Sequence, residues 1–309
     1  MTTEAYPTEV RDRSPHLARA SALVLFSACC FGSIPILTTL ATGGGARLVD
    51  VLSWRYLIAA VLLVIVSGGV RQVRQPSARA LPLLILAGGG QAAIAFVSLS
   101  ALRYIPAAML TFLFYTYPAW VAVISALRGS ERISGGRAVA LLLSLAGIAL
   151  MVGIPGTGHL HPVGVLLALT SALMYAAYIP LIDYLGRGLP PSVTSVYASG
   201  GAAVILVVVA LVQGGLGVRF TPLAWGAIGT MAVFSTVLAF IAFLRGLTVI
   251  GPVRTAIVST IEPFWTALLG ALVLRQGLGP RTLAGGVCIA AAVVLLQLGH
   301  GREATPEPA

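Results

Sequence analysis

Lysine is absent from this 309-residue chain, and only 9% of its residues are charged. Soluble domains carry about a quarter of their residues as charges, so the scarcity of charge excludes a soluble globular protein. The missing lysine also excludes the Gly-x-x-x-x-Gly-Lys-Ser/Thr loop that cradles nucleotide phosphates, and with it an ATP-driven pump subunit. The chain has no His-Glu-x-x-His pair or comparable cluster, which argues against a polytopic membrane enzyme.

Cysteine is scarce too, and its three copies form no recognisable pattern. Cys29, Cys30 and Cys288 all lie inside apolar blocks, at spacings that match neither a disulfide framework nor a metal site. We interpret them as small hydrophobic residues. His159 and His161 fall in an expected loop, where two histidines alone are more typical of a solvated segment than of a metal site. The sequence therefore predicts no metal and no cofactor.

What the chain has in abundance is long apolar sequence. Hydrophobic residues make up 58% of it and occur in uncharged blocks, many of which reach the ~20 residues needed to cross a bilayer. Each block is expected to be a helix, because lipid offers no partner for an exposed backbone N–H or C=O group. The fold class predicted is an all-α polytopic membrane protein with ten transmembrane helices. The expected spans are residues 20–42, 50–69, 80–101, 105–127, 138–154, 162–182, 192–212, 222–244, 252–274 and 282–299.

The net charge of +10 comes from arginines that lie mostly between the apolar blocks. A nucleic-acid-binding protein would gather them on one soluble face, so no nucleic-acid partner is expected. If the N-terminus is cytoplasmic, nine arginines of the first half fall inside and two outside, which is the positive-inside pattern. Abundant Ala, Gly and Arg without Lys indicate a GC-rich bacterial genome. We therefore predict a multi-pass protein of the bacterial cytoplasmic membrane, with both termini cytoplasmic and disordered over residues 1–17 and 300–309.

A repeat at an offset of 145 residues divides the chain into two halves. The first five-helix repeat is expected over residues 18–154 and the second over 162–299, joined by a loop at 155–161. Because five is odd, the two halves insert with opposite topology, which makes an inverted repeat of the kind frequent in secondary transporters. The pairs that define the register are Ile34-Pro35 with Ile179-Pro180, Pro118 with Pro263, and Trp120 with Trp265.

Together with this five-plus-five arrangement, two short motifs resemble a known family. These are Glu262-Pro263 in the ninth span and the segment Ala-Leu-Arg-Tyr-Ile at 101–105, and the chain is similar over residues 18–299 to the EamA family of the drug/metabolite transporter superfamily. That family commonly has Gly-Glu after its fourth and ninth spans, where this chain has Ser130-Glu131 and Arg275-Gln276. We therefore assign Gln276 no role. The resemblance implies export of amino acids, other metabolites or drugs, proton-linked or facilitative.

Glu262 is the sharpest candidate for a functional residue. It lies near the middle of the apolar run 255–274, at a depth where a carboxylate is expensive and usually faces a cavity or a partner. In one interpretation it couples transport to protons or contacts an amine of the substrate. In the other it is a protonated side chain bonded to a neighbouring backbone carbonyl. Its counterpart in the first half is Tyr117, so the halves are not chemically equivalent here.

Four prolines inside the spans are candidate helix breaks and gating positions. Each removes one backbone N–H and frees a carbonyl one turn earlier. Proline is tolerated in membrane helices without any such role, but pairing across both halves favours helices that bend around a central cavity. The four are Pro35, Pro118, Pro180 and Pro263.

The remaining candidates are polar or aromatic side chains within the spans. Arg55 either reaches to the interface or holds a substrate carboxylate as a two-pronged fork. Gln91 follows three glycines that permit close helix approach, and it bonds either another helix or the substrate. Aromatic side chains at mid-span do not fit an interface belt and could line a pocket. They are Tyr115, Tyr117, Tyr175, Tyr178 and Trp265.

The function predicted is therefore not enzymatic. We expect a secondary active or facilitative transporter that exports a small organic metabolite across the cytoplasmic membrane by alternating access. The alternative is an importer or metabolite exchanger of the same fold. The partners expected are a small-molecule substrate, the lipid bilayer and protons; the sequence sets no oligomeric state.

Overall fold

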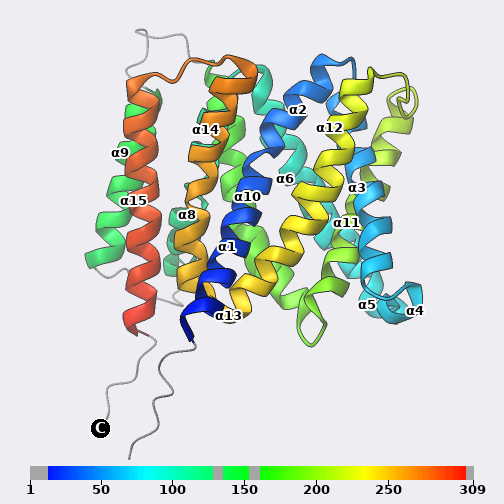
Figure 1. The fold of residues 1–309 in the computed structure, drawn as a ribbon, viewed down its shortest axis with the longest axis horizontal. Helices are drawn as coiled ribbons and strands as arrows, with labels where there is room; N and C mark the ends of the chain where they lie inside the picture. Colours follow the sequence, from blue (N-terminus) through cyan, green and yellow to red (C-terminus); the bar gives the residue numbers. More distant parts are fainter. Residues whose placement is uncertain (1–12, 128–134, 153–160, 304–309) are drawn as a thin grey trace, which may run out of the picture.

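The computed structural model describes residues 13–127, 135–152 and 161–303, and within these ranges the regular structure is helical (Figure 1). Six of the described runs are long and apolar enough to cross a bilayer, judged by length and composition. They are His16–Gly43, Leu48–Val66, Ala78–Arg103, Pro162–Gly186, Ser192–Val212 and Pro222–Ile250. Shorter apolar helices cover Ala107–Val121, Ala138–Leu150, Ile261–Leu274 and Pro280–Leu295. The chain is thus a polytopic membrane protein whose described residues form helices and the turns between them.

Several spans of the first half are built from more than one helical segment. Segment boundaries fall after Gly32, at the π-helical turn η1 and after Phe114. The elements are α1 Arg13–Gly32, α2 Ile34–Gly43, α3 Leu48–Val66, α4 Val70–Val73, α5 Ser77–Pro82, η1 Leu83–Ala87, α6 Gly88–Ser100, the 3₁₀ turn η2 Ala101–Arg103, α7 Ala107–Phe114, α8 Tyr117–Leu127 and α9 Gly135–Val152.

The second half contains longer helices and a second π-helical turn, η3. Its elements are α10 Pro162–Gly186, α11 Pro191–Val212, α12 Pro222–Ala232, η3 Val233–Leu238, α13 Ala239–Ser259, α14 Ile261–Leu274 and α15 Pro280–Glu303. η1 and η3 lie in the third and eighth expected spans, which would be equivalent in the predicted repeat. Such turns widen a helix locally and often occur at functional sites.

Three boundaries differ from those predicted. Helix α1 begins at Arg13, inside the range 1–17 for which disorder is predicted, and α15 continues to Glu303. Helix α13 continues through residues 245–251, which separate the eighth and ninth expected spans. The reason is packing on α1: a Cβ at Gly246 would lie 2.9 Å from the carbonyl oxygen of Ala20, so the glycine permits close helix contact instead of ending the helix. Residues 1–12 and 304–309 lie outside the described ranges.

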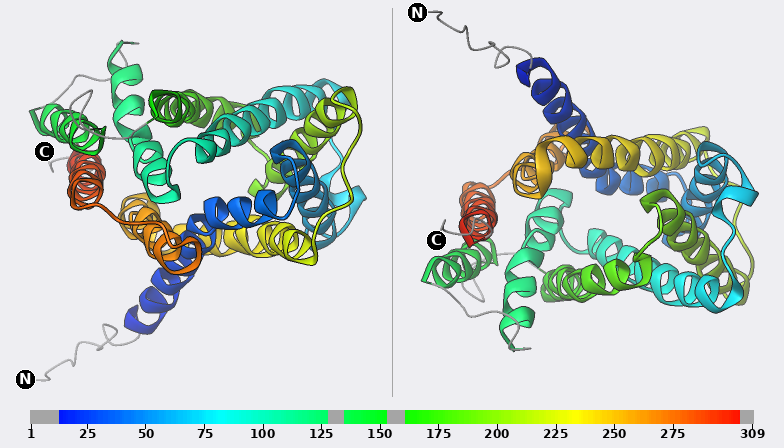
Figure 2. Two further views of the ribbon diagram at one scale, coloured as in Figure 1. Left: turned by 90° about the horizontal axis from the view of Figure 1, so that it is seen from above. Right: turned by 90° about the horizontal axis from the view of Figure 1, so that it is seen from below.

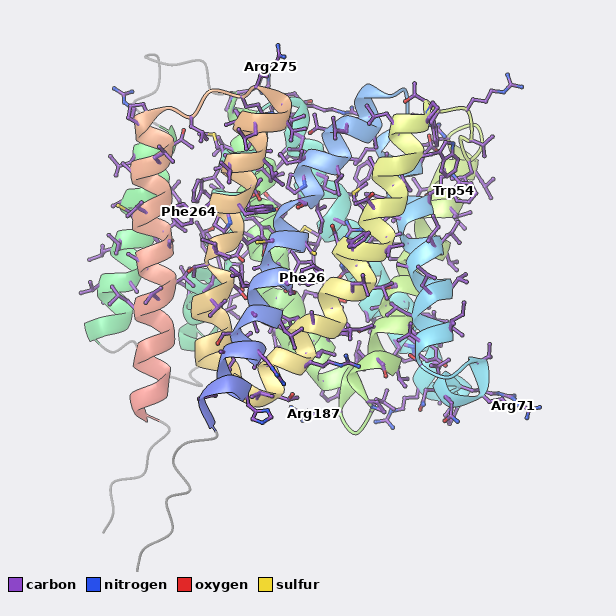
Figure 3. All side chains as sticks on the ribbon, viewed as in Figure 1. Phe26, Trp54, Arg71, Arg187, Phe264 and Arg275 are labelled. Carbon is purple, nitrogen blue, oxygen red and sulfur yellow. The ribbon has the colours of Figure 1, made fainter. Side chains whose placement is uncertain are left out.

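The helices pack in pairs that mirror one another between the halves. Helix α3 packs on α11, α7 on α14 and α9 on α15, and the contact of α1 with α13 is matched by that of α10 with α6. Seen along the helices, α2 and α12 lie in one row and α6 and α10 in another (Figure 2). The start of α1 and the end of α15 lie at one end of the molecule, called here the terminal end (Figure 1). Arg71 and Arg187 lie at this end, and Arg275 lies at the opposite end (Figure 3).

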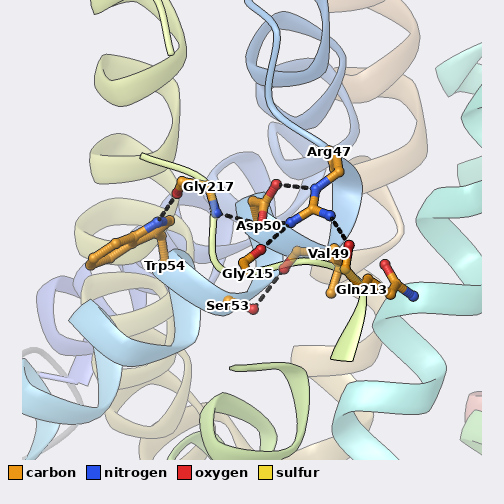
Figure 4. A network of polar contacts seen from close by, with 8 residues as sticks. All are labelled: Arg47, Val49, Asp50, Ser53, Trp54, Gln213, Gly215 and Gly217. Carbon is orange, nitrogen blue, oxygen red and sulfur yellow. Dashed lines mark hydrogen bonds and ion pairs between the residues drawn. The ribbon is translucent and has the colours of Figure 1, made fainter. Parts of the chain in front are cut away.

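A polar network at the opposite end joins the start of α3 to the segment between α11 and α12 (Figure 4). Arg47 donates from Nε and Nη2 to Asp50 at 2.7 and 2.8 Å, and to the carbonyl of Gly215. Asp50 accepts from the N–H of Gly217 at 3.0 Å, and Trp54 donates to the carbonyl of Gly217 at 2.8 Å. The bond to Asp50 raises the pKa of Arg47, which favours the charged pair that joins these two segments.

Candidate functional site

Three interrupted helices meet inside the molecule. The interruptions are Ser33 between α1 and α2, Tyr115-Thr116 between α7 and α8, and Thr260 between α13 and α14. Each is followed by a proline in the first turn of the next helix, namely Pro35, Pro118 and Pro263. Proline is favoured there because its missing N–H has no intrahelical partner anyway. Each of the three helices is thus interrupted two or three residues before a proline.

Glu262 lies half-buried in the first turn of α14. Its carboxyl group is contacted by Tyr115, which belongs to the first half of the chain. The hydroxyl of Tyr115 lies 2.7 Å from Oε2 of Glu262 and donates to the carbonyl of Ser259 at 2.8 Å. Ser259 is the residue whose carbonyl Pro263 leaves without a helical donor. One tyrosine therefore satisfies a freed carbonyl and touches the carboxyl group, and its side chain is only 6% exposed.

The interruption between α1 and α2 packs directly against the same turn of α14. Thr266 donates to the carbonyl of Gly32 at 2.6 Å, and the indole N–H of Trp265 donates to Oγ of Ser33 at 3.1 Å. A Cβ at Gly32 would lie 2.7 Å from the carbonyl oxygen of Glu262. Glycine is thus required at this contact, and Glu262 lies between the α7–α8 interruption and the α1–α2 interruption.

A row of tyrosines leads away from Glu262. The ring centroids of Tyr115 and Tyr117 are 6.0 Å apart, those of Tyr117 and Tyr175 are 4.9 Å apart, and those of Tyr175 and Tyr178 are 6.4 Å apart. At the far end of the row, Tyr178 donates to the carbonyl of Ala87, the last residue of η1, at 3.0 Å. The row brings all four predicted tyrosines together with Glu262, from the interruption between α7 and α8, from α8 and from α10.

The far end of the row borders a second cluster of polar side chains, which come from α3, α6 and η3. Tyr178 packs on Gly90, where a Cβ would lie 2.6 Å from its ring. The next residue, Gln91, donates to the hydroxyl of the fully buried Tyr56 at 3.1 Å. Arg55 lies over the Tyr56 ring at 5.1 Å and donates from Nε to Thr236 in η3 at 3.0 Å. The predicted residues Gln91 and Arg55 thus belong to one group.

The predicted helix break is absent at Pro180. Helix α10 runs without interruption from Pro162 to Gly186, and the Pro180 side chain is exposed. A difference in the preceding residues explains this. Pro35 follows Gly32, which is a weak helix former, and Ser33, whose hydroxyl bonds back to the carbonyl of Cys29 at 2.7 Å. At the equivalent place, Pro180 follows an alanine and a tyrosine.

Two contacts of the site were not predicted. Gln276, to which no role is assigned above, accepts a bond from the N–H of Ala107 at 3.1 Å and so caps the first residue of α7. Thr236, which holds Arg55, lies 145 residues after Gln91. The repeat applied to Gln91 would have found Thr236, whereas nothing in the sequence indicates that Gln276 reaches another helix.

Two opposing electrostatic effects act on the carboxyl group of Glu262. The N-terminal end of α14 favours a negative charge on Glu262, while removal from water disfavours it. Within the described residues no group of three or more His, Cys, Asp and Glu gathers. The ring of His161 lies tilted against that of Tyr104, with 4.5 Å between the ring centroids. His159 and the Ser130-Glu131 pair lie outside the described ranges.

The described residues form a helical body with runs long and apolar enough to cross a bilayer, and polar side chains contact one another between its helices. This is the architecture of a polytopic membrane protein. The family model of the EamA-like transporter family matches residues 18–153 and again residues 162–298. The chain belongs to this family and is a membrane transport protein.

Relatives agree with this assignment. The chain is 25% identical over 283 residues to YcbK, an uncharacterized transporter of Bacillus subtilis (strain 168), which covers 88% of this chain and 90% of YcbK. It is 28% identical over 199 residues to an uncharacterized transporter of Archaeoglobus fulgidus, covering 64% and 69% of the two chains. A solved crystal structure matches 93% of this chain and 99% of its own chain with a TM-score of 0.65. At 17% identity, that likeness concerns the fold alone.

Proposed function

We propose that this protein is a secondary active or facilitative transporter that exports a small organic metabolite, and that the solute site lies along the tyrosine row beside Glu262. The observation that supports this most is the contact of Tyr115 with both Glu262 and the freed carbonyl of Ser259. It places a titratable group at the meeting point of three interrupted helices, which is where secondary transporters commonly bind solutes and ions.

We further propose that the ten expected helices form two inverted five-helix repeats. The family model matches each half separately, and the contact pairs mirror one another between the halves. The four shorter apolar helices would complete the six longer runs. In this arrangement the solute site lies between the halves, so that rocking of one half against the other opens it alternately to either side.

In the proposed mechanism Glu262 carries the coupled proton. The Tyr115 hydroxyl has one proton, yet it lies within hydrogen-bond distance of two oxygens, on Ser259 and Glu262. Both contacts are satisfied if Tyr115 donates to Ser259 and a protonated Glu262 donates to Tyr115. Loss of that proton would leave one hydrogen bond in place of two, because Tyr115 has a single hydroxyl proton for two acceptors, and would leave an ionised carboxylate away from water, which is costly. Access of water relieves that cost, so proton release favours movement of α7 and α14 apart.

The interruptions at Pro35, Pro118 and Pro263 are the proposed bending points. A helix with a freed carbonyl and a missing N–H bends more easily than a continuous one. Because all three contact Glu262 or its neighbours, a change at the carboxyl group reaches all three. Pro180 lies in the continuous α10 and has no part in this mechanism.

Transport itself is tested in two steps. A deletion strain and its parent are screened for resistance to and accumulation of amino acids, aromatic amines and toxic analogues. The solute found is then used for counterflow in proteoliposomes, where preloaded unlabelled solute should drive transient uptake of labelled solute. Absence of counterflow for every solute that differs between the strains would contradict the proposal. Accumulation that falls, instead of rising, in the deletion strain would indicate import.

The proposed orientation has both termini on the cytoplasmic side, supported by the arginine distribution. Arg71 and Arg275 lie at opposite ends of the molecule (Figure 3). In a variant whose three cysteines are replaced by alanine, we expect a cysteine at position 275 to react with a membrane-impermeant maleimide in intact cells. A cysteine at position 71 should react only after the membrane is opened. The reverse pattern would contradict the orientation.

A further inference from the structure

Arg55 is a buried cation without a carboxylate partner among the described residues. Its side chain is 6% exposed, and its contacts are Thr236 and the ring of Tyr56. Of the acids whose side chains are described, Asp50 pairs with Arg47 and Glu262 bonds Tyr115. A buried charge is costly unless it is paired, so this guanidinium lacks the counter-charge that its burial requires.

The neighbours of Arg55 hold the Nε edge of its guanidinium in place, whereas its Nη edge has no hydrogen-bond partner among the described residues. Nε donates to Oγ1 of Thr236 at 3.0 Å, and Thr236 in turn donates to the carbonyl of Met231 at 2.9 Å. Below the guanidinium, Tyr56 is held in place by Gln91 at 3.1 Å. The Nη1 and Nη2 groups make no protein hydrogen bond to the described residues. Two parallel N–H groups on one edge match the two oxygens of a carboxylate.

The repeat shows that this cation belongs to one half only. At the offset of 145 residues Gln91 corresponds to Thr236, so equivalent residues from the two halves hold Tyr56 and Arg55 respectively. The positions equivalent to Arg55 and Tyr56 are Gly200 and Gly201. The two halves thus contribute equivalent hydrogen-bonding residues, Gln91 and Thr236, but only the first half contributes a charge. This asymmetry is expected of a site that binds one end of a polar solute.

We propose that the Nη edge of Arg55 binds the carboxylate of the transported solute, and that the solute is an organic carboxylate with an aromatic or flat apolar body. This inference rests on the proposed function. The tyrosine row that ends at Tyr178, beside Gly90 and Gln91, supplies ring faces for the body. Glu262 does not serve as the counter-ion, because it lies at the other end of that row. One guanidinium edge suits a carboxylate better than a phosphate dianion, which needs more positive charge.

The test compares matched ligands that differ only in charge. Purified protein in detergent is titrated with 3-phenylpropionate, indole-3-acetate and benzoate, and with the three corresponding amides, while its melting temperature is followed. The wild type should be stabilised by at least one carboxylate at concentrations where its amide has no effect. Arg55→Gln should weaken that binding about 10- to 100-fold, as expected for charged hydrogen bonds, and should abolish the preference over the amide.

Three further variants separate binding from structure. Arg55→Lys keeps the charge without the fork and should retain part of the preference. Thr236→Val removes the bond to Nε and should weaken carboxylate binding less than Arg55→Gln does. Arg281→Gln changes an exposed arginine and should leave binding unchanged. If Arg55→Gln does not fold, the lysine and valine variants still test the preference.

Two outcomes overturn the inference. One is a wild type that binds no carboxylate more tightly than its amide; the other is an Arg55→Gln variant with unchanged preference. In the first case, counterflow of a neutral or cationic solute in the same preparation would leave the proposed function intact. Failure of counterflow for every solute would instead remove the proposed function itself.

Discussion

Replacement of Glu262 by glutamine is expected to remove the effect of a pH gradient on transport and to leave solute exchange intact. Glutamine keeps the size of the side chain and donates to Tyr115 through its amide, so the contact between α7 and α14 persists. It cannot bind or release a proton, so the step that loosens this contact is lost. The variant is therefore expected to fold and to exchange solute between equal pools, without net movement driven by protons.

The measurement uses proteoliposomes with the solute identified by the screen. A gradient of about one pH unit, with one proton exchanged per solute, supports an accumulation ratio of about 10. The wild type should approach this ratio, while Glu262→Gln should stay at 1. Glu262→Asp keeps a titratable group on a shorter side chain and should retain part of the coupling. Unchanged accumulation in Glu262→Gln would remove this residue from the mechanism.

Gly201→Ala should destabilise the protein strongly, although it adds only one methyl group. At this glycine the backbone of α11 meets the backbone of η1 and of the first residue of α6. A Cβ at Gly201 would overlap the carbonyl oxygen of Leu84 and lie 2.8 Å from its carbonyl carbon and 3.0 Å from Cα of Gly88. A backbone cannot move aside as a flexible side chain can, so the two helices must separate. Overpacking of this kind costs about 1–3 kcal/mol.

The adjacent glycine provides the control. A Cβ at Gly200 would meet nothing within 4 Å, and alanine is favoured over glycine within a helix by about 0.5–1 kcal/mol. In detergent, Gly201→Ala should therefore melt at a lower temperature than the wild type, and Gly200→Ala at the same temperature or higher. Equal melting temperatures for the two variants would contradict the close approach of α11 to η1 and α6.

The apolar spans could be predicted from the sequence because each is set by composition over ~20 residues. Their interruptions could be predicted only in part. A proline inside a span shows that one backbone bond is missing, but it does not show whether the helix stops there. The structure distinguishes Pro35, which comes three residues after the weak helix former Gly32, from Pro180, which comes three residues after the strong helix former Ala177.

The candidate site was predictable where a residue is unusual for its depth. Glu262 and the mid-span tyrosines stand out in an apolar chain, and the structure brings them together. Contacts between distant helices were not predictable, because a threonine or glutamine is common in any span. Thr236 becomes significant only beside Arg55, and Gln276 only beside the first N–H of α7.

The account depends most on a Glu262 that holds a proton while bonded to Tyr115. Infrared difference spectroscopy of the purified protein detects the carbonyl stretch of a protonated carboxylic acid directly. At neutral pH we expect such a band in the wild type, absent from Glu262→Gln and shifted in Tyr115→Phe, where one hydrogen-bond partner is lost. If the Glu262→Gln difference spectrum instead showed only the loss of an ionised carboxylate, insensitive to Tyr115→Phe, the proposed proton carrier and its link between α7 and α14 would be contradicted.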